Sequence, residues 1–477
     1  MTTITKPTIR KAWANAISQP AQEFPLTPLP IIAGKIPTGL RGTLYRNGPA
    51  RLERGGQKVG HWFDGDGAIL AVKFSDNGAT GIYRYVQTSG YIAESKANKY
   101  LYPNYGMTAP GLFWNQWIRP VKNAANTSVL ALPNKLLALW EGGKPHALDL
   151  ETLQTQGLDD LSVLGDKLTF SAHPKCDAKT GEIFNFGVTA GKNSTLNLYK
   201  SDSTGKILQK SSFIVDGLPL IHDFVMAGKY LIFFIPPVRV NLVKALFGLQ
   251  SFSDAMEWKP QLGTQVLVFD RTTLSLVSKS ETESWYQWHF SNGYVDNNGE
   301  IVIDFFRYKD FQTNQRLKHF PTGELPIPAK STLSQVRLDP ESAKVKSSEE
   351  LLDRDGEFPI VPQENVGQFS RYTFMSLHGK NSDTTREIYS TIARFDHQTN
   401  TLKEANLGEN HYPTEPIYAP DFLNTNQSWV LTVVYDGNKN QSEVWVFDSE
   451  RLDDEPVCKL GLPSVVPMGF HGTWKAG

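Results

Sequence analysis

The sequence predicts an all-β protein and, among all-β architectures, favours a β-propeller. Short segments rich in β-branched and aromatic residues recur from one end of the chain to the other. Hairpin-type turns such as Asn298-Gly299 and Asp436-Gly437 separate them. The chain has 477 residues, too many for one sandwich, whereas a closed ring can grow because each unit packs only on its neighbours. The sequence contains no WD or kelch repeat, so the prediction depends on strand spacing alone.

The predicted strands are apolar on most positions and end at Gly, Asn, Asp or Pro. In chain order they include "GTLYRNG" (42–48), "AILAVKF" (68–74), "GIYRYVQT" (81–88), "KLLALWEG" (135–142), "EIFNFGV" (182–188), Leu220–Met226, "YLIFFIP" (230–236), "QVLVFD" (265–270), "EIVIDFFRY" (300–308), "EIYSTIARFD" (387–396), "SWVLTVVYD" (428–436) and "EVWVFD" (443–448).

Three segments break this pattern. Residues 8–19 are predicted to form a short helix, and residues 111–126 and 239–257 carry apolar side chains at helical spacing. In the last segment one broad face would contain Val240, Leu242, Val243, Leu246, Phe247 and Leu249. Such segments either pack on the main body as insertions, or form a lid around an apolar site, or present a face that dips into a membrane surface.

The composition excludes several classes of protein. Lys plus Arg number 48 and Asp plus Glu 49, so the chain lacks the basic excess of a nucleic-acid-binding protein. Two separate cysteines, Cys176 and Cys458, provide neither a zinc ribbon nor a disulfide framework, which favours the reducing cytoplasm. We find no signal peptide at the N-terminus and no apolar run long enough to span a membrane.

Four of the ten histidines lie in apolar, strand-like surroundings: His173, His222, His289 and His471. Their separations are 222 − 173 = 49, 289 − 222 = 67 and 471 − 289 = 182, and 182 is close to three times 61. A propeller blade of four strands with long loops could have about that period. The spacing is compatible with four blades that each send one histidine to the central axis, and equally with four separately satisfied core histidines.

The other six histidines, His61, His146, His319, His378, His397 and His411, are expected on the surface or in loops because Pro, Gly or polar residues surround most of them. "FDGDG" (63–67) could suggest a calcium loop, but it lacks the further oxygen ligands and runs directly into a strand. We interpret it as a glycine-rich turn capped by its own aspartates.

Ten further stretches, in order along nearly the whole chain, resemble the carotenoid cleavage oxygenase family, in particular its compact bacterial apocarotenoid-cleaving members. They are "LRGTLYRNGPA" (40–50), "FDGDG" (63–67), "NAANTSV" (123–129), "LLALWEGGKPHALD" (136–149), "SAHPK" (171–175), "LIHDFV" (220–225), "WHFSNGY" (288–294), "EFPIVP" (357–362), "EPIYAP" (415–420) and "FHGTW" (470–474).

The resemblance implies one domain over residues 1–477, a seven-bladed propeller with a helical and loop cap over its axial iron. The N-terminal arm would cover about residues 1–30, and the cap insertions about 101–127 and 237–258. Matched residue by residue, the Fe(II) ligands would be His173, His222, His289 and His471. The carboxylates that hold three of these imidazoles would be Glu141, Glu357 and Glu415. Carboxylates there orient imidazole rings and offset part of the metal's charge.

The resemblance also places Thr127 beside the iron, where its methyl group limits one open position, and suggests that Trp140 and Trp288 line a substrate tunnel. It implies a dioxygenase that cleaves a conjugated double bond of a carotenoid or apocarotenoid with O2. Two alternatives remain open within the family: cleavage of a stilbene-like phenylpropenoid, and isomerisation without cleavage. Outside the family, the chain could be a non-enzymatic propeller that binds a partner. The protein is expected in the cytoplasm, and its apolar substrate implies peripheral contact with a membrane. The contact would be made by residues 240–249, where Lys244 suits anionic headgroups, and by Leu112, Phe113, Trp114 and Trp117.

Overall fold

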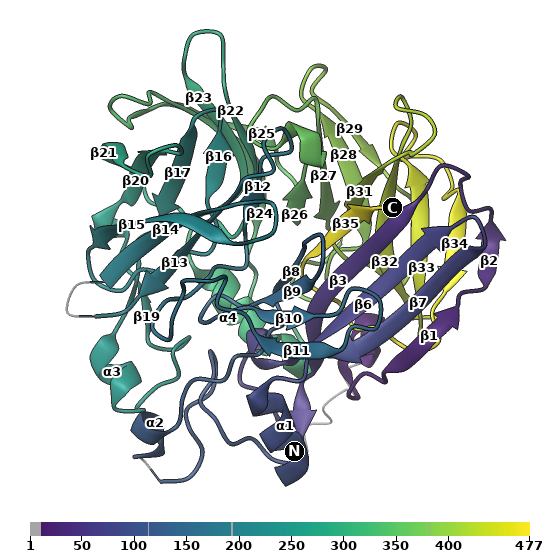
Figure 1. Ribbon diagram of the computed structural model, residues 1–477, viewed down its shortest axis with the longest axis horizontal. Helices are drawn as coiled ribbons and strands as arrows, with labels where there is room; N and C mark the ends of the chain where they lie inside the picture. The colour runs from purple at the N-terminus through teal and green to yellow at the C-terminus, as the bar shows by residue number, and fades with distance from the viewer. Residues whose placement is uncertain (1–10, 113, 192–193, 381) are drawn as a thin grey trace, which may run out of the picture.

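The structure, a computed structural model, describes residues 11–112, 114–191, 194–380 and 382–477. Seven sheets of four or more antiparallel strands surround one axis as the blades of a β-propeller (Figure 1). We number the blades 1 to 7, starting with the blade that contains the first strand of the chain. The propeller prediction is confirmed, as are the seven blades that the resemblance implied.

Blades 2 to 6 each consist of four strands that follow one another along the chain, except where blade 4 contains an inserted hairpin. Blade 2 contains β8 (Ser128–Ala131), β9 (Leu136–Leu139), β10 (His146–Leu148) and β11 (Thr155–Leu158). Blade 3 contains β12 (Lys175–Cys176), β13 (Ile183–Thr189), β14 (Ser194–Ser201) and β15 (Ile207–Val215). Blade 4 contains β16 (Val225–Ala227), β17 (Tyr230–Ile235), β20 (Thr264–Asp270) and β21 (Leu276–Thr282). Blade 5 contains β22 (Phe290–Val295), β23 (Ile301–Tyr308), β24 (Ser331–Leu338) and β25 (Val345–Leu352), and blade 6 contains β26 (Gly356–Ile360), β27 (Tyr372–Leu377), β28 (Thr391–Asp396) and β29 (Thr401–Glu404).

The two ends of the chain close the ring by exchanging strands between blades 1 and 7. Blade 1 contains β1 (Phe24–Pro28), β3 (Gly42–Arg51), β6 (Asp66–Ser75), β7 (Gly78–Tyr85) and the C-terminal β35 (Gly472–Ala476). Blade 7 contains the N-terminal β2 (Ile31–Gly34) with β30 (His411–Pro413), β31 (Ile417–Pro420), β32 (Ser428–Asp436), β33 (Gln441–Asp448) and β34 (Cys458–Gly461). β35 pairs with β3 and contacts the inner strands β8 and β31 of both neighbouring blades, so the last residues of the chain reach the axis.

The burial pattern of a strand follows its depth in the blade. All six residues of β17 are buried, because neighbouring blades cover both faces of this strand. β15, at the outer edge of blade 3, alternates between buried or half-buried and exposed residues over most of its length. Continuous apolar runs therefore mark inner and middle strands, and alternation marks outer ones.

Helices and loops from several blades gather at one end of the propeller and form the cap. The helices are α1 (Ser89–Ala97), α2 (Asn115–Ile118), α3 (Leu242–Leu246) and α4 (Gln312–His319). Figure 1 shows α1, α2 and α3 together at the lower side of the view. A hairpin of β18 (Val238–Val240) and β19 (Met256–Trp258) flanks α3, and the small elements are η1 (Ala12–Ile17), β4 (Glu53–Arg54), β5 (Gln57–Lys58), η2 (Trp62–Asp64), η3 (Pro260–Leu262), η4 (Phe320–Thr322) and η5 (Gln363–Asn365).

The predicted helices were longer than the helices in the structure. Within the described residues of the range 111–126 only α2 is helical, and Pro120 follows it closely. Within 239–257 only α3 is helical, and it stops before Gly248, whose φ of 65° is the left-handed conformation that ends helices. For residues 8–19 the structure shows the 3-10 turn η1, and residues 8–10 lie outside the described residues.

The turn at "FDGDG" is capped by its own aspartate, as expected. The Asp64 carboxylate accepts hydrogen bonds from the backbone N–H groups of His61 at 2.8 Å and Gly106 at 2.8 Å. The chain then enters β6 at Asp66. Burial raises the pKa of Asp64 to about 7.

Candidate metal centre

The four predicted histidines come together at the propeller axis. Each precedes the inner strand of a different blade: His173 lies before β12, His222 before β16, His289 before β22 and His471 before β35. The interval of 182 residues between His289 and His471 spans three blade steps, because blades 6 and 7 lie between them. The predicted strand Leu220–Met226, which included His222, was wrong at its start, because β16 begins only at Val225. The residues directly before β16 do not pair with a neighbouring strand, which allows the imidazole to turn toward the axis.

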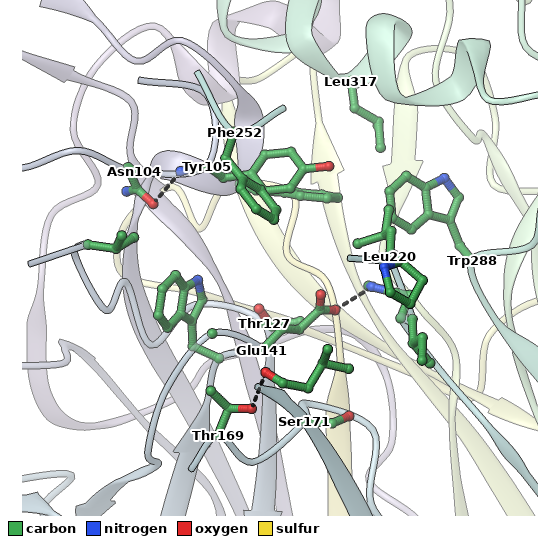
Figure 2. Close-up of a pocket in the computed structure, with 18 of the residues that line it drawn as sticks. Asn104, Tyr105, Thr127, Glu141, Thr169, Ser171, Leu220, Phe252, Trp288 and Leu317 are labelled. Atoms are coloured by element: carbon green, nitrogen blue, oxygen red, sulfur yellow. Dashed lines mark hydrogen bonds and ion pairs between the residues drawn. The ribbon is translucent and has the colours of Figure 1, made fainter. Parts of the chain in front are cut away.

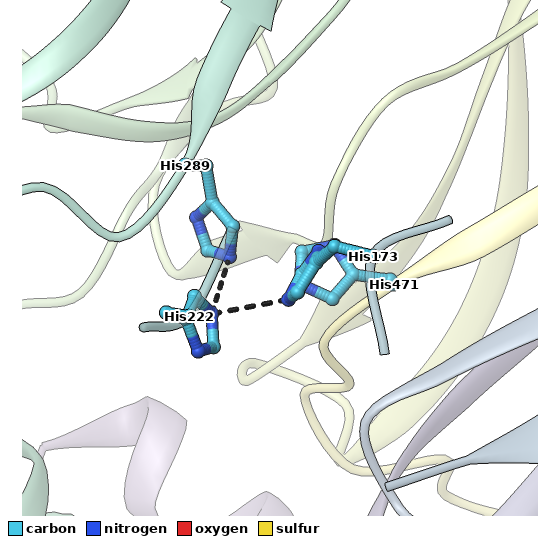
Figure 3. Close-up of side chains that lie close together, drawn as sticks. All are labelled: His173, His222, His289 and His471. Atoms are coloured by element: carbon cyan, nitrogen blue, oxygen red, sulfur yellow. Dashed lines mark hydrogen bonds between the residues drawn. The ribbon is translucent and has the colours of Figure 1, made fainter. Parts of the chain in front are cut away.

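The imidazole nitrogens lie at distances that suit one ion. Nε2 of His222 is 3.1 Å from Nε2 of His173 and 3.1 Å from Nε2 of His289 (Figure 3). The ligand nitrogens of all four residues, including His471, lie within 4.8 Å of one another, and all four residues are buried. Two nitrogens bound about 2.1 Å from one metal ion at right angles would be about 3 Å apart. The cluster therefore has the dimensions of a four-imidazole metal site.

The electrostatic surroundings keep three of these imidazoles in the neutral form that binds metals. Burial, reinforced by the neighbouring imidazoles, lowers the pKa of His173, His289 and His471 well below the usual histidine value. At His222 burial also favours the neutral ring, but the carboxylates of Glu141, Asp223 and Glu357 together outweigh it and raise the pKa. Neutral imidazole is the ligand form, because a protonated ring offers no lone pair.

Three carboxylates hold the outer nitrogens of three rings. Nδ1 of His289 lies 2.7 Å from Glu357 Oε2, and Nδ1 of His471 lies 2.8 Å from Glu415 Oε1. Nδ1 of His222 pairs with Glu141 Oε1. These contacts direct each Nε2 toward the axis. The glutamates come from blades 2, 6 and 7, so every blade supplies one side chain to the centre.

Two buried groups that sequence reasoning missed hold these carboxylates in turn. The Arg46 guanidinium lies 3.1 Å from Glu415 Oε2, which also accepts a 2.8 Å hydrogen bond from the Gly472 N–H. The Tyr308 hydroxyl donates to Glu357 Oε1 at 2.8 Å. Burial raises the pKa of Glu415 to about 7 and that of Glu357 to about 8. The sequence did offer a signal for Arg46, because it is a charged residue within the otherwise apolar strand segment "GTLYRNG".

Asp223, next to His222, connects three of the histidine-bearing segments. Its carboxylate accepts hydrogen bonds from the backbone N–H of Phe224 at 2.8 Å and of Phe290, the neighbour of His289, at 3.0 Å. It also forms a 2.8 Å ion pair with Lys175, two residues after His173. The buried aspartate therefore anchors the backbone on which three of the rings are mounted.

We expect Asp223→Ala to lower the free energy of unfolding by about 2 kcal/mol, because hydrogen bonds to a charged group contribute about 1.5–3 kcal/mol. The change leaves the Lys175 ammonium and two buried N–H groups without their acceptor. Urea denaturation followed by tryptophan fluorescence measures the effect, with Glu341→Ala on the exposed surface as control. Equal midpoints for the two variants would show that Asp223 does not anchor these segments.

An apolar cavity of about 780 Å³ lies between the histidines and the cap. His222, His289, His471 and Glu141 line it on the propeller side, and side chains of α2, α3 and α4 line it on the cap side. Figure 2 shows Tyr105, Phe252, Leu220 and Trp288 around the space above Glu141. The site can therefore hold a long apolar molecule against three of the four imidazoles, those of His222, His289 and His471.

The structure places all three further site residues, Thr127, Trp140 and Trp288, in the lining of this cavity. Thr127 directly precedes β8, the inner strand of blade 2, and its carbonyl accepts a hydrogen bond from the His471 N–H at 3.2 Å. The Trp288 ring packs edge-on against His222 at 4.8 Å, and its Nε1 donates to Thr313 Oγ1 at 3.0 Å.

Three of the six histidines expected on the surface or in loops are buried, although two of them, His61 and His378, do lie outside the helices and strands. His61 lies under the cap, where its Nε2 is 3.1 Å from the Asn314 carbonyl. His146 is in β10, and His378, which follows β27, lies 3.4 Å from Asp355. Their polar sequence neighbours suggested loops, but contacts from other blades bury them. His319, His397 and His411 remain at least partly exposed.

The RPE65 family model, described as retinal pigment epithelial membrane protein, matches residues 17–476. The apocarotenoid-15,15'-oxygenase of Synechocystis is 30% identical over 93% of this chain and 92% of its own. The resveratrol cleavage oxygenase 1 of Aspergillus fumigatus is 27% identical over 94% and 92%. Among solved structures, cobalt-substituted Synechocystis ACO has a TM-score of 0.87 and 29% identity, covering 98% of both chains.

Proposed function

The chain belongs to the RPE65/carotenoid oxygenase family, and from that membership we infer that it is a dioxygenase that cleaves a conjugated carbon–carbon double bond of a carotenoid or apocarotenoid with O2, giving two carbonyl products. The observation that carries this function is a cluster of four buried imidazoles, three of which line an apolar cavity of about 780 Å³. Such a cavity suits a long polyene, which has little to offer a protein except apolar contact.

We propose that the metal is one Fe(II) per chain, held by His173, His222, His289 and His471. The donor set fits, because four imidazole nitrogens suit iron, and a reaction with O2 calls for a redox-active metal, which excludes zinc. Bound Fe(II) supplies the redox chemistry that makes O2 reactive. Glu141, Glu357 and Glu415 orient three rings and offset part of the added positive charge.

The remaining residues act on the substrate by shape. Trp140 and Trp288 offer flat apolar walls against which a conjugated chain can lie in one plane. The Thr127 methyl group narrows the space beside His471, so that O2 and the double bond have a restricted approach. No side chain is required as a general acid or base, since the products form by splitting a C=C bond and O2.

A second candidate is cleavage of a stilbene-like double bond, which the relative that acts on resveratrol supports. The Fe(II)-loaded protein is incubated with apocarotenals and stilbenes under ¹⁸O2, and the products are identified by mass spectrometry. Labelled carbonyl fragments from apocarotenals alone support the first function, and fragments from stilbenes alone support the second. A rearranged but uncleaved polyene would indicate an isomerase, and a protein that binds no iron would indicate a binding propeller.

We further propose that the cap around α2 and α3 docks on a membrane surface to receive the substrate. Trp117, Leu246 and Phe247 are each more than half exposed, and the Trp117 ring lies edge-on 6.0 Å from that of Phe247. Trp117 and Leu246 also line the cavity, which supports an entrance at this apolar surface. Phe113, included in the predicted surface, lies outside the described residues. None of the described helices has the length and apolar character needed to cross a bilayer.

We expect Leu246→Asp with Phe247→Asp to reduce co-sedimentation with liposomes and to raise the apparent KM for a long apocarotenal. Each large apolar side chain that enters a membrane contributes about 1.5–3 kcal/mol. Phe422→Asp with Leu423→Asp, at two somewhat more exposed apolar residues of blade 7, is the matched control. If both double variants bind liposomes like the unmodified protein, the proposed surface is wrong. A thermal melt identifies loss of fold.

A further inference from the structure

Arg316 presents a buried guanidinium to the cavity that the proposed chemistry does not use. It lies on α4 and is only 8% exposed. Thr313, Arg316 and Leu317 all line the cavity and are spaced three and four residues apart, so one face of α4 looks into it. Lys167, the other cation of the described lining, is exposed to solvent, so Arg316 is the buried cation of the substrate site.

The guanidinium is only partly satisfied by the protein. Its Nη1 donates to the Ile327 carbonyl at 3.1 Å and its Nη2 to the Glu387 carbonyl at 2.9 Å. Within the described residues no carboxylate forms an ion pair with it at 4.0 Å or less, and those of Asp355 and Asp383 attract it only from farther away. A guanidinium carries five N–H groups, so two such bonds leave three available. Buried charges are normally paired, and a purely hydrocarbon ligand would leave this one without an anion.

The position of Arg316 separates it from the cavity entrance. The proposed entrance lies at α2 and α3, whereas Arg316 lies on α4 and shares the lining with Ala329 and Tyr389. Ala329 and Tyr389 belong to the segments that lead into β24 and β28, in blades 5 and 6. A polyene that enters between α2 and α3 and passes over the histidines would bring its far end to this region.

We propose that Arg316 binds an oxygen acceptor at the end of the polyene, with a terminal carboxylate bound most strongly. This proposal rests on the function inferred above and specifies its substrate class: conjugated chains that end in a carboxylic acid or, more weakly, an aldehyde. A guanidinium recognises a carboxylate through two parallel hydrogen bonds. Because the bound end is fixed, the cleaved bond is counted from the oxygenated end of the chain.

Binding is measured without turnover, by quenching of tryptophan fluorescence under anaerobic conditions with an apocarotenoic acid and its methyl ester. We expect Arg316→Met to raise Kd for the acid about 10–100-fold, the usual effect of losing a charge-assisted hydrogen bond, and to leave Kd for the ester within about twofold. Arg239→Met is the matched control, since Arg239 also donates to two carbonyls, of Pro236 and Val238, outside the cavity.

Two further readouts separate binding from structural support. In the unmodified protein, palmitate should displace the polyene at least about tenfold better than hexadecanol, a comparison that needs no variant. In acids of increasing length the cleaved bond should stay at a constant distance from the carboxylate, and in Arg316→Met it should vary. Equal loss of acid and ester binding in Arg316→Met, or equal displacement by palmitate and hexadecanol, would overturn the proposal. Failure to cleave any polyene would instead contradict the proposed function, because the binding measurements require no cleavage.

Discussion

Replacing any one of His173, His222, His289 or His471 by Ala is expected to remove bound iron and polyene cleavage together. The four nitrogens lie within 4.8 Å of one another, and the described residues offer no fifth histidine at the axis. Loss of one ligand opens a further coordination position to water and weakens the remaining three. Iron content by mass spectrometry and product formation on the same samples check this expectation.

His222 should be the most sensitive of the four. Its Nε2 lies 3.1 Å from both His173 and His289, so it occupies the central position among three ligands. His222→Ala also leaves the Glu141 carboxylate without its partner. Titration with Co(II) gives a second measurement, because the visible absorption of bound cobalt reports the ligand set without any turnover.

His411→Ala is the matched control for these variants, since His411 is a partly exposed histidine at the start of β30 in blade 7. It should keep iron and activity unchanged. Thermal melts of all variants separate loss of metal from loss of fold. An axial variant that retains full iron and full activity would remove that histidine from the proposed ligand set.

The second large effect concerns the carboxylates: Glu141→Gln, Glu357→Gln and Glu415→Gln should each weaken iron affinity or turnover about 10–100-fold. Glutamine keeps the shape and one acceptor oxygen but loses the negative charge that offsets the metal. Iron affinity is measured by competition with a chelator, and turnover at saturating iron. Glu341→Gln, exposed on the surface, is the control.

The structure ranks the three substitutions. Glu415→Gln should be the most severe, because its new NH2 group would face the Arg46 guanidinium and the Gly472 N–H, which are both donors. At Glu357 the neighbouring Tyr308 hydroxyl can rotate and accept instead. Glu141 is about one-third exposed, so water can compensate there. If all three variants equal the unmodified protein in iron affinity and rate, the assignment of these carboxylates is wrong.

The strands were largely predictable from the sequence, and the helices were not. The predicted segments 428–436 and 300–308 correspond to β32 and β23 almost residue for residue, because a buried strand needs a continuous apolar run. Apolar residues at helical spacing misled at 239–257, where a hairpin and Gly248 interrupt the helix. α4 was missed because "QTNQRLKH" consists mostly of polar residues and shows no apolar periodicity. Only one face of this helix lines the cavity.

The sequence by itself determined the strand-rich architecture and, through motifs that can be read in order, the family. The resemblance to that family supplied the four histidines and three glutamates as predicted site residues. Only the tertiary structure decided that β35 closes blade 1 and brings His471 beside residues nearly 300 positions earlier. It also decided that Arg46 contacts Glu415, that Asp223 joins three segments, and that Arg316 faces the cavity with no described carboxylate in ion-pair contact. These contacts join residues of different blades, and their distances depend on how the blades pack around the axis, which no local pattern records.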